Sequence, residues 1–401
     1  MEASIFDLIV VGGGAAGFFA AINFAERFPE ARVLILEQSQ RVLDKVKISG
    51  GGRCNVTHAC FDPRELVGFY PRGNKALLGP FHRFMCGDML AWLDERGVET
   101  KIEEDGRIFP VSNKSQTIID CFMERIEALN ILLNTQCKVQ DFTQKKDMWE
   151  VRSTQGNFMT KKLLIATGSS KKMWGNLEKL GHKIVAPLPS LFTFNSKHSL
   201  LKDLPGLSVK MGSVKVKDTK LEEQGPILIT HWGLSGPGIL KLSAWGARIL
   251  AQKNYNFTIF VNWTAVDYEE VKGVLQTNKT TLARNKVLLS PQFDVPKRLW
   301  AKMISFCKIM DKNWADLSKQ NLLDLANTIA KCTIEVKGKS TFKAEFVTCG
   351  GIELDEVNFK TMESKLFPNL YFAGEILNID GVTGGFNFQA AWTTAWVMAQ
   401  G

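Results

Sequence analysis

Short apolar runs and a helical segment alternate at the start of the chain. Residues 5–11 and 32–37 are rich in Val, Ile and Leu, which is typical of strands buried on both faces. Between them, residues 15–28 predict a helix that ends near Pro29. Strand, helix and strand in this order predict an α/β fold.

The middle of the chain predicts strands first and then a helix. Residues 209–217 and 255–261 alternate between apolar and polar side chains, as half-buried strands do. Pro296 can open a helix, because its fixed φ suits the first turn. Apolar residues then recur at helical spacing and are expected to face a core: Leu299, Trp300, Met303, Ile304, Cys307 and Met310.

A glycine motif lies between the first strand and the first helix. Residues 12–17 fit G-x-G-x-x-G, and Glu37 follows Gly17 by 20 positions at the end of the second strand. In the dinucleotide-binding motif, Gly12 permits a tight turn, Gly14 lets the backbone approach a diphosphate, and Gly17 lets the helix pack on the strand. The helix N-terminus favours the anion, and the acid accepts hydrogen bonds from ribose hydroxyls. The alternative is a glycine-rich turn in an unrelated α/β fold.

The end of the chain narrows the choice of dinucleotide. Residues 369–375 form an apolar strand that ends in Gly-Glu, residues 380–387 read DGVTGGFN, and a helical stretch follows. Together with the N-terminal motif, this layout resembles FAD enzymes of the glutathione-reductase type. In those enzymes the late acid meets the ribityl or diphosphate region, and the last helix points its N-terminus at the flavin pyrimidine.

A closer resemblance covers nearly the whole chain. The sequence resembles the BaiN/RdsA-type flavoproteins, which are described as NAD(P)/FAD-dependent oxidoreductases and sometimes as aminoacetone oxidases. The longest matching segments are "KISGGGRCNVT" at 47–57 and "LYFAGEILNIDGVTGGFNFQAAW" at 370–392. Shorter matches are "DGRIFPVSNKSQ" at 105–116, "LLIATGS" at 163–169, "ITHWGLSGP" at 229–237 and, less closely, "FVTCGGI" at 346–352.

The resemblance implies three parts. A discontinuous, Rossmann-like FAD-binding domain of the glutathione-reductase type would comprise residues 1–188 and 346–401. A β-barrel-like insert would comprise residues 189–263 and 332–345, and a helical insert residues 264–331.

One loop departs from the family. Residues 166–175 run almost directly into Leu180-Gly181-His182, whereas the family has about eight further residues here, a difference that surface loops tolerate. The loop would lie near the flavin. Its shortening puts access of substrate or nicotinamide in doubt, and would suit a divergent branch with another substrate.

The motifs and the resemblance give a set of residues expected to bind FAD. They are Gly12, Gly14, Ala15, Ala16, Gly17, Glu37, Gln38, Lys45, Ser49, Gly51, Gly52, Arg53, Cys54, Asn55, Thr167, Gly168, Gly374, Glu375, Asp380, Gly384, Gly385, Phe386 and Asn387. Arg53 would balance phosphate charge. Gly384 and Gly385 would offer N–H groups to the negative charge that reduction places on the flavin; the alternative is a flexible turn.

Two residues are candidates for the chemistry itself. His231, in the inserted domain, could act as general acid or base beside hydride transfer or bind a substrate carbonyl; the alternative is that it pins the turn before Pro237. Cys54 would need a lowered pKa to react, and the alternative is a packed thiol. A dithiol mechanism is rejected, because Cys54 and Cys60 lack the spacing that glutathione-reductase-type enzymes use.

Composition limits the partners and the compartment. The 401 residues include 50 Lys and Arg against 41 Asp and Glu, a net charge of +9. This excess suits an anionic cofactor or substrate and is too small to predict nucleic acid. The eight cysteines form no C-x-x-C pair, so neither a metal site nor disulfides are expected. Free thiols, a poor signal-peptide pattern and no long apolar segment favour a cytoplasmic protein without a membrane partner.

We therefore expect an FAD-dependent oxidoreductase that passes hydride through flavin N5. Its substrate would be a small organic molecule, either an amine or an unsaturated carbonyl compound. No second G-x-G-x-x-G follows a strand in the middle of the chain, so NAD(P)H would be a transient reductant without a domain of its own. Two alternatives stay open: a nucleic-acid-linked flavoprotein, such as a tRNA-modifying enzyme, and a non-catalytic redox sensor. The sequence does not set the oligomeric state.

Overall fold

The computed structural model describes residues 5–340 and 347–401. The chain divides into two compact units. The first comprises Met1–Leu188 and Lys343–Gly401, and the second comprises Pro189–Phe342. The domain boundary expected at residues 345 and 346 lies outside the described residues.

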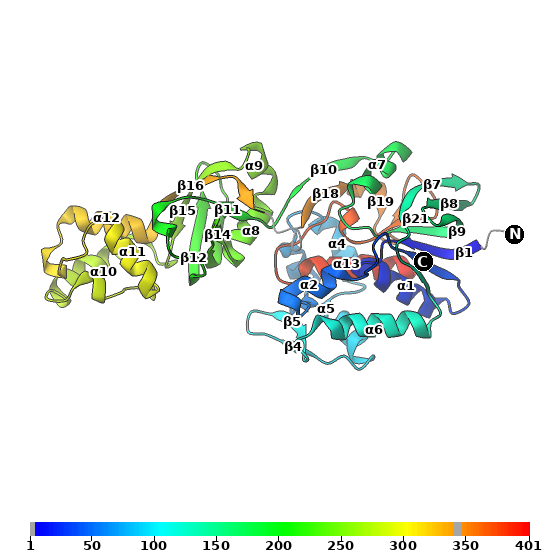
Figure 1. The fold of residues 1–401 in the computed structure, drawn as a ribbon, viewed down its shortest axis with the longest axis horizontal. Coiled ribbons are helices and arrows are strands. Elements are labelled where there is room, and N and C mark those ends of the chain that lie inside the picture. The colour runs from blue at the N-terminus through cyan, green and yellow to red at the C-terminus, as the bar shows by residue number, and fades with distance from the viewer. Residues whose placement is uncertain (1–4, 341–346) are drawn as a thin grey trace. The chain divides into compact units, whose positions relative to one another are not determined.

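A nine-stranded sheet forms the centre of the first unit (Figure 1). Its middle is parallel, in the order β6-β2-β1-β9-β21. All of β2 is buried, because helices cover parallel sheets on both faces. Four antiparallel strands extend the sheet. The nine strands are β1 (Ile5–Val11), β2 (Val33–Leu36), β6 (Leu132–Asn134), β7 (Val139–Lys145), β8 (Met148–Ser153), β9 (Gly156–Ile165), β19 (Val357–Asn358), β20 (Glu363–Ser364) and β21 (Leu370–Phe372).

Two helices from opposite ends of the chain pack against each other in this unit. α1 (Ala15–Arg27), in blue, follows β1, and α13 (Phe386–Ala399), in red, lies near the C-terminus (Figure 1). The close approach of α1 to β1 requires Gly17, since a Cβ there would lie 2.0 Å from the carbonyl oxygen of Gly12. Most of α13 is buried, which explains why it is apolar on nearly every face.

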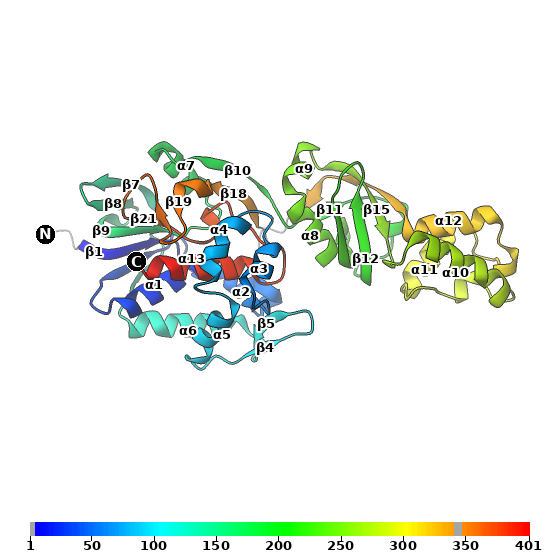
Figure 2. The same ribbon diagram turned by 180° about the vertical axis from the view of Figure 1, so that it is seen from behind.

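Smaller elements surround this core. α4 contacts both α3 and α13, and Figure 2 shows this side of the unit. A three-stranded sheet joins β3, β5 and β4, and β10 pairs with β18. The bounds are α2 (Asp44–Gly52), β3 (Thr57–His58), α3 (Pro63–Leu66), α4 (Asn74–Phe81), α5 (Cys86–Asp94), β4 (Thr100–Ile102), β5 (Arg107–Pro110), α6 (Ser115–Ala128), α7 (Lys171–Leu180), β10 (Ile184–Pro189) and β18 (Thr348–Ile352).

The second unit contains a seven-stranded antiparallel sheet that closes on itself. β16 and β17 lie at opposite ends of the strand order, yet only Gly338 separates them along the chain. Gly338 has a φ of +89°, a bend that glycine adopts without strain. The strands are β11 (Thr193–Asn195), β12 (Ser208–Val216), β13 (Glu222–Ile229), β14 (Gly233–Ser235), β15 (Asn256–Asn262), β16 (Cys332–Lys337) and β17 (Lys339–Ser340).

Helices of the second unit share one apolar core with this sheet. Three of them, α10 to α12, lie between β15 and β16 in the sequence. The five helices are α8 (Pro237–Trp245), α9 (Ala247–Gln252), α10 (Tyr268–Thr281), α11 (Lys297–Phe306) and α12 (Lys319–Ala330).

The structure confirms the α/β fold and most predicted elements, with one correction. The strands predicted at 209–217 and 255–261 correspond to β12 and β15 within one residue at each end. The helix predicted after Pro296 is α11, but it ends at Phe306, and Met310 is 41% exposed rather than part of the core. In the sequence, the helical spacing of apolar residues extends beyond Phe306, where α11 ends. Among the described helices, none is both long enough and apolar enough to cross a membrane.

We expect Gly17→Ala to lower the free energy of unfolding by about 3 kcal/mol, because the added methyl group forces the first glycine turn away from α1. Gly175→Ala is the matched control. Gly175 lies inside α7, and a Cβ there meets no atom within 4 Å. This variant should gain about 0.5–1 kcal/mol from helix propensity. Urea unfolding of both variants measures the difference, and a Gly17→Ala protein as stable as wild type would contradict the close approach.

Candidate functional site

Four neighbouring parallel strands of the first unit end at the same edge of its sheet. After these ends come Gly12 beyond β1, Glu37 beyond β2, Thr167 beyond β9 and Gly374 beyond β21. In open α/β sheets, ligands bind outside the carboxyl ends of the strands. The structure therefore brings together four residues that are up to 362 positions apart in the sequence.

The segments that follow these strand ends lie close to one another. A Cβ on Gly374 would lie 3.0 Å from the Cβ of Ala16, and one on Gly168 would lie 3.7 Å from the Glu375 carboxylate. The Lys45 ammonium pairs with the same carboxylate at 2.5 Å. The late Gly-Glu pair therefore contacts both the start of α1 and the start of α2.

The glycine turn before α1 has both packing and open positions. A Cβ on Gly12 would lie 2.5 Å from a backbone oxygen at the end of β9, and Gly17 is equally crowded. A Cβ on Gly14 would meet no atom within 4 Å. The protein itself does not require glycine at position 14, so a ligand approaching the backbone is the better reason for it. Ala15 and Ala16 follow as the first helical residues, where free N–H groups favour an anion.

Glu37 has a fixed carboxylate at the end of β2. One of its oxygens accepts a hydrogen bond from the Gly13 N–H at 2.7 Å, and the other accepts one from the Ser39 N–H at 2.8 Å. An ionised carboxylate has about four acceptor positions, so Glu37 retains capacity for ribose hydroxyls. The neighbouring Gln38 is exposed.

The glycines at the end of α2 form a second open backbone segment. Gly51 and Gly52 have φ values of +70° and +85°, and a Cβ on either would meet no atom within 4 Å. Ser49 donates a hydrogen bond from its hydroxyl to the Val46 carbonyl at 3.0 Å, which directs this side chain back onto the helix. The open glycines fit the expected close approach of the chain to a cofactor.

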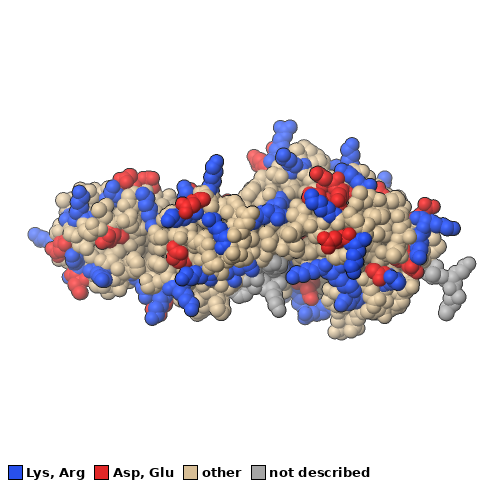
Figure 3. Space-filling view, turned by 90° about the horizontal axis from the view of Figure 1, so that it is seen from above, with Lys and Arg blue, Asp and Glu red and all other residues tan. Residues whose placement is uncertain are grey.

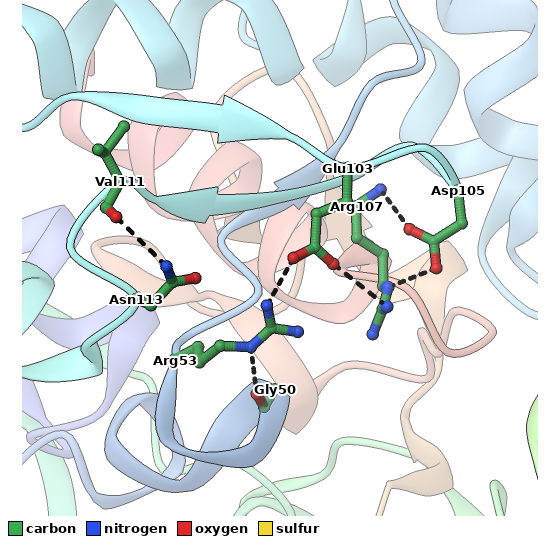
Figure 4. Close-up of polar contacts among 7 residues, drawn as sticks. All are labelled: Gly50, Arg53, Glu103, Asp105, Arg107, Val111 and Asn113. Atoms are coloured by element: carbon green, nitrogen blue, oxygen red, sulfur yellow. Dashed lines mark hydrogen bonds and ion pairs between the residues drawn. The ribbon is translucent and has the colours of Figure 1, made fainter.

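Arg53 already has a partner in the protein. Its guanidinium donates to Glu103 at 2.5 Å and to the Gly50 carbonyl at 3.4 Å (Figure 4), and it lies 3.8 Å from the centre of the Phe109 ring. Arg107 also pairs with Glu103, at 3.3 Å. Arg107 pairs more closely with Asp105, at 2.7 Å, so two arginines face two carboxylates here (Figure 4). The role of Arg53 toward phosphate stays a prediction.

Buried groups follow Arg53. Cys54 is fully buried, and burial raises the pKa of its thiol to about 12, so the thiol is protonated at neutral pH and poorly nucleophilic. The side-chain oxygens of Asn55 and Thr167 are buried and lack a hydrogen-bond partner among the described residues. Buried polar atoms of this kind normally have a partner, and both belong to segments expected to contact FAD.

The loop before α13 is held by its own polar contacts. The buried Asp380 accepts a bidentate pair of hydrogen bonds from the Arg72 guanidinium, whose Nε lies 2.5 Å from one carboxylate oxygen. The Asn387 amide both accepts from the Gly381 N–H and donates to the Gly381 carbonyl, each at 2.9 Å. Asp380 and Asn387 thus shape the loop, and any contact they make with FAD stays a prediction.

The turn that opens α13 lies against β3. Gly384 and Gly385 have φ values of +130° and +98°, and a Cβ on Gly385 would lie 2.6 Å from the Thr57 carbonyl. The Gly384 carbonyl oxygen lies 3.0 Å from Nδ1 of His58. Phe386 begins the helix and is buried. The turn predicted as flexible in the alternative interpretation is therefore packed on both sides.

An open hollow of about 710 Å³ adjoins this turn. Its lining residues are His58, Ala59, Cys60, Phe61, Asp62, Glu65 and Phe69. Phe61 is 54% exposed, so its ring can pack against a flat apolar molecule in the hollow. The hollow offers space for a small organic molecule next to the segment that precedes α13.

His231 belongs to the second unit and lies in the exposed turn between β13 and β14. The Thr230 hydroxyl closes this turn by accepting from the N–H groups of Trp232 and Gly233, at 3.2 and 3.1 Å. The turn therefore does not depend on His231 for its shape. Its role as a general acid or base stays a prediction.

Three residues of this region were not anticipated from the sequence. His58 directly follows the matching segment 47–57, Arg72 lies in a turn without a motif, and Thr348 has a buried hydroxyl without a partner among the described residues. The Thr348 N–H donates to Glu375 at 2.9 Å. Only the three-dimensional pairing identifies Arg72. His58 could have been found by extending the motif one residue, and Thr348 lies within the matching segment 346–352.

Relatives with a stated function match the chain over nearly its full length. It is 26% identical over 404 residues to the ribosomal RNA dihydrouridine synthase of Escherichia coli, covering 98% of this chain and 97% of that protein. It is 24% identical over 402 residues to the 3-dehydro-bile acid delta(4,6)-reductase of Clostridium scindens, covering 97% of each. Among solved structures, a 3-ketosteroid-delta4-(5alpha)-dehydrogenase from Rhodococcus jostii superposes with a TM-score of 0.50 at 12% identity, over 98% of this chain and 97% of that one.

Gly14→Ala tests whether the open position before α1 serves a ligand. We expect stability without FAD to equal that of wild type, because the methyl group meets no protein atom. FAD affinity should fall at least about tenfold, because the methyl group occupies the approach to a diphosphate. Fluorescence titration of the FAD-free protein measures the affinity. Unchanged FAD binding would contradict the assignment of this turn.

Two open glycine segments, two buried polar atoms without partners and a helix N-terminus at the sheet edge fit FAD. Residues 6–401 match the family described as HI0933-like protein Rossmann domain. The protein has a Rossmann-type FAD-binding domain and is an FAD-dependent oxidoreductase. The chain belongs to the HI0933-like Rossmann family.

Proposed function

We propose that this enzyme reduces a carbon–carbon double bond conjugated to a carbonyl group. The observation that carries the proposal is that two full-length relatives of different kinds have names that describe such a reduction. Dihydrouridine is uridine with two hydrogens added to a double bond beside a carbonyl, and a delta(4,6)-reductase acts on ring double bonds. The unsaturated carbonyl class is therefore favoured over the amine class.

The residues of the site suit a reductase. Bound FAD supplies hydride transfer through its N5. The N-terminus of α13 directs its positive dipole end toward the turn at Gly384 and Gly385, where it would stabilise negative charge. The Lys45–Glu375 and Arg72–Asp380 pairs keep the surrounding segments in place without supplying an unpaired charge.

The cysteines support direct hydride transfer rather than a thiol relay. Cys54 and Cys60 are both free and buried, and burial raises the pKa of each thiol. Thiols that stay protonated are poor nucleophiles and poor redox partners. The electrons must then come from a diffusible donor, for which NADH or NADPH is the simplest choice.

The proposal predicts which compounds reduce the bound flavin and which reoxidise it, and the amine and unsaturated carbonyl classes differ in both respects. Under anaerobic conditions, NADH or NADPH should bleach the flavin absorbance, and a primary amine should not. A 3-oxo-4-ene steroid should then restore the oxidised spectrum, because its double bond accepts hydride. The saturated 3-oxo steroid is the matched control and should leave the flavin reduced. Bleaching by the amine, or no reaction with any donor, would contradict the proposal, and the second outcome would favour a redox sensor.

A second candidate is that the double bond belongs to a uracil base within RNA. The specific observation is a division of charge between the units. The second unit contains 22 Lys and Arg against 12 Asp and Glu, a balance of +10, whereas the first contains 28 against 29. The modest charge of the whole chain conceals this difference. On the face shown in Figure 3, the basic side chains are dispersed among acidic ones rather than gathered in one patch.

This candidate predicts salt-dependent binding to RNA by the full chain. Affinity for ribosomal RNA should fall on the order of 100-fold between about 50 and about 200 mM salt, because Lys and Arg release counterions from phosphates. With NADPH present, mass spectrometry of the digested RNA should find uridine heavier by two hydrogens. Gly14→Ala is the control that retains the second unit; it should bind RNA as wild type does and modify it less when FAD is limiting. RNA that neither binds at low salt nor gains hydrogen would exclude the candidate.

A further inference from the structure

We propose that His58 is a positioning residue that fixes the peptide group between Gly384 and Gly385, and thereby favours the reduced form of FAD. His58 lies at the end of β3, far in sequence from α13. The inference depends on FAD binding and not on the substrate.

The hydrogen bond at His58 defines which ring nitrogen carries the proton. Nδ1 lies 3.0 Å from the Gly384 carbonyl oxygen. A carbonyl oxygen can only accept, so Nδ1 must be the donor. The imidazole is thus protonated at Nδ1 whether it is neutral or charged.

Neighbouring groups hold the ring in this orientation. The Phe386 ring centre lies 4.6 Å from that of His58, and Phe69 stacks on Phe386 at 4.3 Å with an angle of 10°. On the opposite edge of the imidazole, a Cβ on Gly106 would lie 2.6 Å from Nε2. The ring is therefore placed by the β4–β5 hairpin on one edge and by the α13 turn on the other.

The peptide held by His58 joins two residues whose own backbone restricts its rotation little. Both of its residues are glycines with positive φ, and glycine populates many backbone conformations of similar energy. The described residues include no cis peptide, and in a trans peptide the C=O and N–H point in opposite directions. By holding the Gly384 carbonyl, His58 directs the Gly385 N–H away from itself and toward the other side of the turn.

Directing this N–H matters because it immediately precedes α13. The N–H groups at a helix N-terminus stabilise a negative charge placed before them. A donor on the carbonyl oxygen also polarises the peptide, which strengthens the N–H on the same group. Reduction adds negative charge to FAD, so a fixed and polarised peptide stabilises reduced FAD more than oxidised FAD.

Leu and Asn at position 58 form a matched pair for the test. The two side chains have nearly the same shape, and only Asn can donate a hydrogen bond. His58→Leu should lower the affinity for reduced relative to oxidised FAD about tenfold, which corresponds to a midpoint potential about 30 mV lower for a two-electron couple. His58→Asn should restore most of the difference. Equilibration of the FAD-loaded protein with redox dyes measures the potential.

Two further variants separate the hydrogen bond from packing. His58→Phe retains the aromatic contact with Phe386 and should lower the potential as Leu does; it replaces Leu in the comparison if the Leu variant does not fold. Phe69→Leu removes the ring that stacks on Phe386 and keeps the hydrogen-bond donor, so its potential should stay closer to that of wild type than to that of His58→Leu.

Two results would overturn the proposal. One is a midpoint potential equal to that of wild type in His58→Leu or His58→Phe. The other is a midpoint potential in His58→Asn that is as low as in His58→Leu. If the potentials are as expected but the amine bleaches the flavin, or the 3-oxo-4-ene steroid does not reoxidise it, the proposed substrate is wrong. The role of His58 is then unaffected.

Discussion

The packing of α1 against α13 is the interaction on which the FAD-binding unit depends. It joins a helix that starts at residue 15 to one that starts at residue 386. α1 also lies close to β1, and this second contact requires glycine at position 17, since a Cβ there would lie 2.0 Å from the Gly12 carbonyl oxygen. Once the helices meet, β1 and β21 lie on either side of β9, and their carboxyl ends form one edge.

The site relies on backbone groups more than on free charges. Its cationic side chains at Lys45, Arg53 and Arg72 each face a carboxylate of the protein. The groups left for a dinucleotide are N–H groups at open glycines and at two helix N-termini, where uncharged donors hold anions. Such donors are fixed before binding, so they need little rearrangement when charge develops on the flavin. His58 fits this pattern, since it acts on a peptide group and not on the flavin itself.

The two units differ in their chemistry as well as in their folds. The first unit is close to electrically neutral, and the second carries the positive excess. The closed antiparallel sheet of the second unit and its inserted group of helices share one apolar core.

The sequence by itself determined the strand, glycine turn and helix at the start of the chain, because that motif depends on local backbone conformation. It also indicated FAD, because the late Gly-Glu and glycine segment resembles known flavoproteins. It could not identify Arg72 or the pairing of Arg53 with Glu103. These contacts join segments that are far apart in the sequence, and no repeating pattern of residues relates them. It also placed Met310 in the core, whereas α11 ends at Phe306 and Met310 is 41% exposed. Tertiary structure alone decided these points, because partners for a buried charge or a peptide group are chosen by proximity in space, and that proximity is set by the packing of the whole unit.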